Sequence, residues 1–141
     1  TGYLYVEGRR LLKSLASVSS DTFETVRSYV NDAVGFRMDP EVGLGFSERF
    51  FGRADAISDT GGILRIHDLK TGTTPAHIEQ LMGYDAYYCL EYHVNPCDIE
   101  HELRIYQNND VLVAKPEGPD IQLMMDRVVQ FDKLQYEFEE E

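Results

Sequence analysis

The chain has 141 residues, of which 43% are hydrophobic, and a formal net charge of −12. This length and composition can bury one hydrophobic core, which predicts a single domain over residues 1–141 and argues against two domains. No apolar run approaches the roughly 20 residues that cross a bilayer, and no short apolar segment follows a basic start as in a signal peptide, so we expect a cytoplasmic protein with no membrane partner.

The acidic residues are concentrated in the second half of the chain. Residues 1–70 have a net charge of −1, whereas residues 71–141 have a net charge of −11. Because nucleic-acid-binding surfaces usually have excess Lys and Arg, tight binding of duplex DNA by charge alone is not expected. Phosphate contacts are expected instead from a few basic residues: Arg9, Arg10, Lys13, Arg49 and Arg53. The chain begins at Thr1, so we expect a processed product or a segment truncated at its N-terminus.

The first half of the sequence predicts two helices followed by three strands. Apolar residues at helical spacing predict a helix over residues 3–15, and a second helix is predicted between Ser20 and Gly35. After a turn at residues 38–40, residues 42–46 and 50–57 have strand character, with a turn at 47–49 that predicts a hairpin. The turn sequence Asp59-Thr-Gly-Gly62 leads into a third strand over residues 63–69.

The second half predicts a helix over residues 77–92, which Asn95-Pro96 ends, and a strand over residues 99–106. A short strand at 111–114 and an amphipathic helix over 119–138 follow. The order ααβββαβα, with the short strand as an addition, predicts an α/β fold in which helices flank a mixed sheet.

Two carboxylates and an ammonium group are expected to meet on neighbouring strands. The alternation of side chains in the third strand places Asp68 and Lys70 on the same face as Ile66, with His67 on the other face. Asp55 lies thirteen residues before Asp68, and the Gly-Gly turn between them allows antiparallel pairing. Paired carboxylates suit Mg²⁺ or Mn²⁺, which can polarise a phosphodiester while Lys70 assists the nucleophile. Taken singly, Asp55 fits a cap for backbone amides and Lys70 a solvated strand end.

The helix over residues 77–92 has a polar stripe. Gln80 and Tyr84 are four residues apart and share this stripe. Gln80 is suited to hydrogen-bond a phosphate or base, and Tyr84 to stack on a base. The structural alternative is an aromatic helix face that packs on the sheet, which we favour for Tyr88.

Three motifs in order resemble those of RecB-like PD-(D/E)XK nucleases: Gly52-Arg-Ala-Asp55, Asp68-Leu-Lys70 and Gln80-Leu-Met-Gly-Tyr84, which match G-x-x-D, D-x-K and Q-x-x-x-Y. The resemblance covers about residues 40–107 and is greatest to phage-type exonucleases. It implies a restriction-endonuclease-like core with Asp55, Asp68 and Lys70 as catalytic residues. It also implies that Asp55, Asp68 and the main-chain carbonyl of Leu69 bind the metal, and that Gln80, Tyr84 and Arg53 contact the substrate.

The family usually has a further His or Glu ligand in an upstream helix, and no residue of this chain clearly matches it. Glu7 is the best-placed candidate, with Glu41 and Glu48 as alternatives. His93, Cys97 and His101 recur at intervals of four, but Pro96 interrupts the helix that a zinc site would need, so this site is disfavoured.

The resemblance therefore predicts a Mg²⁺- or Mn²⁺-dependent DNA nuclease, an exonuclease rather than an endonuclease. It would act in bacterial or phage DNA recombination, replication or repair, with DNA and a homo-oligomeric or recombination partner, in a bacterial or phage-infected cell. The alternative is a catalytically impaired module for DNA or protein binding, which the unmatched ligand and the acidic second half favour. A restriction-type endonuclease would share the same site.

Overall fold

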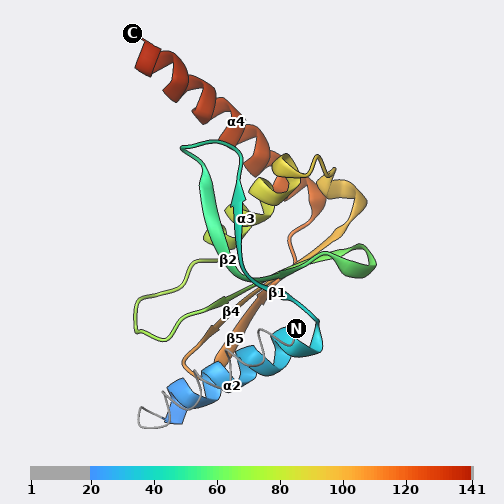
Figure 1. The fold of residues 1–141 in the computed structure, drawn as a ribbon, viewed down its shortest axis with the longest axis vertical. Helices are drawn as coiled ribbons and strands as arrows, with labels where there is room; N and C mark the ends of the chain where they lie inside the picture. Colours follow the sequence, from blue (N-terminus) through green and yellow to red (C-terminus); the bar gives the residue numbers. More distant parts are fainter. Residues whose placement is uncertain (1–19, 141) are drawn as a thin grey trace.

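The computed structural model describes residues 20–140, with side chains to residue 139. Five strands form one mixed sheet in the order β1-β2-β3-β4-β5. Helix α2 covers one face of the sheet and α3 the other, and α4 packs against α3 (Figure 1). The elements are α2 (Ser20–Gly35), β1 (Asp39–Gly45), β2 (Phe51–Ser58), η1 (Thr60–Gly62), β3 (Ile63–Leu69), α3 (Ile78–Glu91), η2 (Pro96–Asp98), β4 (Glu100–Gln107), β5 (Asp110–Ala114) and α4 (Gly118–Glu140).

This architecture confirms the predicted α/β class with a mixed sheet flanked by helices, and it is compatible with a restriction-endonuclease-like core. The helix predicted over residues 3–15 lies outside the described residues. Within residues 20–140, no helix has both the length and the hydrophobicity to span a membrane.

Antiparallel pairing joins β1 to β2 and β2 to β3, whereas β3 and β4 are parallel and α3 connects them. The β2–β3 connection passes through Gly61 and Gly62, which have φ of +70° and +76°. Residues without a Cβ adopt this left-handed backbone at no steric cost, so the two glycines permit the tight connection predicted at this point.

Strand β1 begins earlier than the sequence predicts. Residues 38–40 were expected to form a turn, yet Asp39 and Pro40 already pair with Ile57 and Ala56 of β2. Pro40 is tolerated because β1 is an edge strand, where a residue without an N–H removes no bond from a second neighbour.

The side chains of β3 alternate between two cores, as predicted. Leu64 and Ile66 are fully buried in the core beneath α3, together with Leu81. On the other face, His67 is buried and Leu69 packs against the core beneath α2. This alternation places Asp68 on the α3 face of the sheet and His67 on the α2 face.

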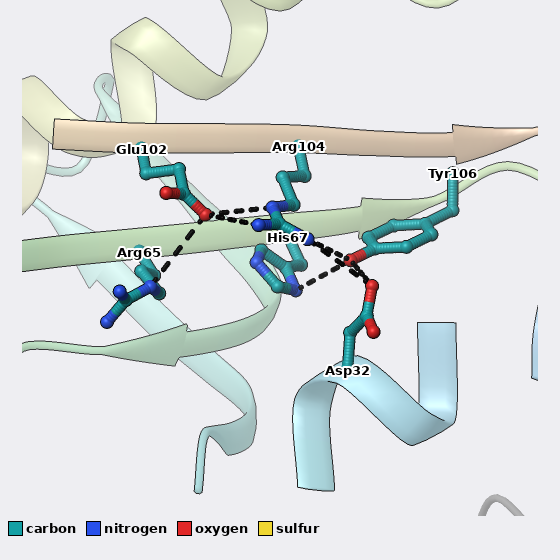
Figure 2. Close-up of polar contacts among 6 residues, drawn as sticks. All are labelled: Asp32, Arg65, His67, Glu102, Arg104 and Tyr106. Atoms are coloured by element: carbon teal, nitrogen blue, oxygen red, sulfur yellow. Dashed lines mark hydrogen bonds and ion pairs between the residues drawn. The ribbon is translucent and has the colours of Figure 1, made fainter. Parts of the chain in front are cut away.

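A polar network connects α2 to the α2 face of the sheet (Figure 2). The guanidinium of Arg104 contacts Glu102 Oε1 at 2.8 Å and Asp32 Oδ2 at 3.3 Å. The Tyr106 hydroxyl donates to the same Asp32 oxygen at 2.6 Å and lies 3.4 Å from His67 Nδ1. Because the single phenolic proton is used on Asp32, His67 Nδ1 must be the donor to the Tyr106 oxygen.

His67 is therefore a neutral core histidine. Burial, Arg104 and Arg65 lower the pKa of His67 to about 3. The ring of Phe36 packs edge-on against His67, and the guanidinium carbons of Arg65 and Arg104 lie 4.4 and 5.1 Å from the centre of the Phe36 ring. These contacts fix the C-terminal end of α2 on β3 and β4.

On the other face, a buried hydrogen bond between His101 and Asp85 joins α3 to β4. His101 Nδ1 lies 2.6 Å from Asp85 Oδ2, and His101 Nε2 lies 2.8 Å from the carbonyl oxygen of Pro96. Both ring nitrogens of His101 are thus occupied, whereas His93 and Cys97 are exposed. Within residues 20–139, these three residues do not gather into a cluster of metal-binding side chains.

Candidate functional site

Asp55 and Asp68 lie where strands β2 and β3 separate. The regular pairing between these strands covers only Ala56 with His67, Ile57 with Ile66 and Ser58 with Arg65. One step further along the same register, Asp55 is opposite Asp68. Two carboxylates on directly opposed positions disfavour continued pairing of β2 with β3.

The Asp55 side chain replaces the lost backbone bond. Its Oδ2 accepts a hydrogen bond from the Leu69 N–H at 2.8 Å. A buried N–H needs a partner, and here a carboxylate supplies it in place of a strand carbonyl. The prediction that the two carboxylates meet at the end of β3 therefore agrees with the geometry. Asp55 also binds a backbone amide, as the alternative interpretation expected.

Asp68 is 7% exposed, and its Oδ2 accepts no hydrogen bond. Lys70 Nζ lies 3.1 Å from this oxygen, an ion-pair distance without hydrogen-bond geometry. The Lys70 backbone N–H donates to the Tyr106 carbonyl at 2.9 Å, which continues the parallel pairing with β4. The ammonium group and the carboxylate are thus brought together, as predicted.

The electrostatics of the pair suit a cation. The pKa of Asp55 is raised to about 6, with burial as the largest cause and the neighbouring Asp68 acting in the same direction, while the Leu69 N–H and Lys70 oppose the shift. A buried carboxylate oxygen without a hydrogen bond is costly unless a cation compensates it, and here the Lys70 ammonium does so in part. Two carboxylates with one such oxygen fit Mg²⁺ or Mn²⁺, which prefer oxygen ligands. Within residues 20–139, no three His, Cys, Asp or Glu side chains gather closely enough to bind a metal by themselves.

Gln80 and Tyr84 lie on the first turns of α3, beside the carboxylates. Gln80 Nε2 donates to the Tyr84 hydroxyl at 3.0 Å. Burial raises the pKa of Tyr84, and the charge of Asp68 acts in the same direction. The Tyr84 ring lies against Gly52 of β2, where an added Cβ would overlap its Cε1 atom. The glycine of the first motif therefore makes room for the tyrosine of the third.

Arg53 is exposed and forms a loose ion pair with Glu41, with Nη2 and Oε2 3.8 Å apart. Glu41 itself is opposite Asp55, because Pro40 pairs with Ala56 and Val42 with Ala54. Its φ is +52°, an unusual conformation for a residue with a side chain. Of the three candidates for the further ligand, Glu7 lies outside the described residues, Glu48 lies exposed in the β1–β2 turn, and Glu41 is next to the site.

Tyr29 of α2 is not among the site residues predicted from the sequence. It is 6% exposed. Burial raises its pKa, and Asp55, Asp68 and Glu41 raise it further, so the hydroxyl lies within the field of all three carboxylates. The pattern that predicted the helix between Ser20 and Gly35 gave no signal that Tyr29 lies near the site.

No protein-family model matches this sequence, and no curated protein matches it. Among solved structures, the fold is similar to one titled "Crystal structure of SSO0001". The two share 16% sequence identity over 90% of this chain and 70% of that chain, with a TM-score of 0.34. Similarity at this level carries no information about function.

Proposed function

We propose that this domain is a Mg²⁺- or Mn²⁺-dependent deoxyribonuclease, an exonuclease that acts in the cytoplasm of a bacterial or phage-infected cell during DNA recombination, replication or repair. The observation that carries the proposal is the buried Asp68 oxygen without a hydrogen bond, next to Asp55 and 3.1 Å from the Lys70 ammonium. The three motifs that surround this site support a nuclease rather than another metal-dependent enzyme.

Asp55, Asp68 and the Leu69 carbonyl would bind the metal, and Glu41 is the described residue best placed to add a ligand. When bound, the metal polarises the phosphodiester and makes a water molecule more acidic. Lys70 places a positive charge where negative charge develops on the phosphate, and its position beside Asp68 keeps it oriented. Gln80 and Tyr84 present a hydrogen-bonding group and an aromatic ring to the DNA, and Arg53 contacts phosphate at the rim.

The second candidate is a binding module in which the fold has lost cleavage. The net charge of −12 favours it, because a domain this acidic binds phosphate weakly. The absence of a third side-chain ligand among residues 20–139 also favours it.

Single-turnover cleavage separates the two candidates. End-labelled linear DNA and closed circular DNA are incubated with the protein in Mg²⁺, Mn²⁺ or EDTA. We expect metal-dependent release of labelled nucleotides from linear DNA, with the circle left intact. Cleavage of the circle would identify an endonuclease, and no cleavage in any metal would refute the enzyme and support the binding module.

The Lys70→Met variant tests the chemistry at the site. Methionine keeps an apolar stem of similar length but has no charge, so metal binding should survive while the rate falls about a hundredfold, which corresponds to roughly 3 kcal/mol. DNA binding measured in Ca²⁺ is the control and should change far less. Equal cleavage rates for the two proteins would remove Lys70 from the mechanism.

Metal binding is tested apart from cleavage by thermal unfolding. A ligand that binds only the folded state stabilises it by mass action, so Mn²⁺ should raise the melting temperature of the wild type. The Asp55→Ala variant should show a much smaller increase. A melting curve that does not respond to Mn²⁺ in the wild type would contradict the metal site.

A further inference from the structure

The segment between β3 and α3 joins two parts of the candidate site. It begins directly after Lys70 and ends at α3, where Gln80 and Tyr84 lie on the first turns. Residues 71–75 are exposed, and the segment projects beyond the end of β3 before it returns to α3 (Figure 1). A substrate held between Lys70 and Gln80 therefore lies next to this segment.

Gln107, the last residue of β4, holds the middle of the segment. Its amide nitrogen donates to the Gly72 carbonyl at 2.9 Å and to the Thr74 carbonyl at 2.8 Å. A side-chain amide nitrogen has two N–H donors, so one glutamine can hold two carbonyl groups at once. The ends of the segment are fixed separately, by the bond from the Lys70 N–H to β4 and by Ala76, which packs against the core beneath α3.

The segment presents hydrogen-bond donors and no carboxylate of its own. The backbone N–H groups of residues 71–74 and the hydroxyls of Thr71, Thr73 and Thr74 have no hydrogen-bond partner among the described residues. From Lys70 to Ile78 the sequence contains no Asp or Glu, although the chain has 25 of them. Backbone N–H and threonine hydroxyl groups are common partners of DNA phosphate oxygens, so this segment suits a phosphate group.

We propose that Gln107 is a positioning residue for the DNA strand. It holds residues 71–74 so that their N–H and hydroxyl groups bind the phosphate next to the one at Lys70. A segment that is already held loses less conformational freedom when the DNA binds, so Gln107 favours binding without touching the DNA. This role rests on the proposed function, because it takes DNA as the ligand of the site, and it adds a residue outside the three motifs.

The hold on the segment can be tested without metal or DNA. Gln107→Met keeps the length of the side chain and removes both donors, so the backbone heteronuclear NOE of residues 71–74 should fall in this variant. Gln122→Met is the matched control and should leave these values unchanged, since Gln122 is also half-buried but donates to Asp126 within α4. Circular dichroism checks that both variants fold. Unchanged NOE values in Gln107→Met would refute the hold.

DNA binding without cleavage tests the role. The fluorescence anisotropy of a fluorescein-labelled duplex with a single-stranded end, measured in Ca²⁺, should give a Kd at least about tenfold higher for Gln107→Met than for the wild type or Gln122→Met. The slope of log Kd against log salt concentration should stay the same, because no charge is lost. Arg53→Met removes a charge at the rim of the site and should change this slope by about one.

Each outcome of the binding measurement is decisive. Equal Kd values for the wild type and Gln107→Met would overturn the role, and so would a wild type that does not bind the DNA. A changed salt slope in Gln107→Met would show a general disturbance of the charged groups of the site and would also overturn it. A wild type that binds the DNA but cleaves none would refute the nuclease alone, since a weaker Gln107→Met complex would still support the positioning role.

Discussion

The close approach between β2 and α3 at Gly52 can be tested by adding a single methyl group at this position. In Gly52→Ala, the new Cβ would overlap Tyr84 Cε1 and lie 2.8 Å from Cδ1 and 3.1 Å from Cζ. Ordinary contacts begin near 3.4 Å, so the ring must move. Tyr84 packs against the core beneath α3, which limits that movement. Insertion of a methyl group into such a contact costs about 1–3 kcal/mol, and we expect a loss of this size in the free energy of unfolding.

Urea denaturation of four proteins isolates the contact: the wild type, Gly52→Ala, Tyr84→Ala and the double variant. If the ring is what the methyl group meets, Gly52→Ala should cost little in the Tyr84→Ala background. Gly43→Ala is the control, because no atom lies within 4 Å of the position of its Cβ. The same cost of Gly52→Ala with and without the Tyr84 ring would refute the proposed clash.

Three further predictions concern buried titratable residues. The pKa of His67 is about 3 in the folded state and about 6.5 in the unfolded state, so its contribution to stability is complete above pH 6.5. This contribution is lost as the pH falls toward 3, by about 1.4 kcal/mol for each pH unit. A His67→Gln variant should lack this part of the acid dependence in urea titrations at several pH values. His101→Phe leaves Asp85 buried with only the weak Cys89 thiol donor and should cost about 3–5 kcal/mol in urea denaturation. Addition of Asp85→Leu should recover most of this loss, and no recovery would show that the pair is not the cause. Asp68→Asn removes repulsion with the neighbouring carboxylate, so thermal unfolding without metal should show equal or greater stability. The Mn²⁺-induced increase in melting temperature should disappear in this variant. A large loss of stability without metal would show that Asp68 is structural.

The fold was predictable where local chemistry determines the chain path. The Gly61-Gly62 turn, the break at Pro96 and the alternation in β3 each leave one reasonable interpretation, and α3 was predicted to within one residue at either end. The early start of β1 was not predictable in this way. Pro40 indicates a turn in isolation, and only the position of β1 at the edge of the sheet makes a paired proline acceptable.

Part of the site was likewise predictable. The spacing of Asp55 and Asp68 across a short turn specifies their opposition, and Lys70 follows by strand alternation. The proximity of Tyr29 and Glu41 comes from packing of α2 and from the register of an edge strand, and neither leaves a periodic signal in the sequence. The hydrogen bond from the Leu69 amide to Asp55 was also not predicted, because it forms only where the regular pairing of β2 with β3 ends.

That last bond gives the protein an internal spectroscopic reporter. An amide proton directed at a carboxylate oxygen experiences a charge, whereas its neighbours in the strand face neutral carbonyl groups. Its chemical shift should therefore follow the ionisation of Asp55 as the pH changes, and it should respond again if the proposed cation binds the same carboxylate. The adjacent Lys70 amide, which donates to the Tyr106 carbonyl, is the internal reference. Two successive backbone resonances thus distinguish a change of charge at the site from a general movement of β3.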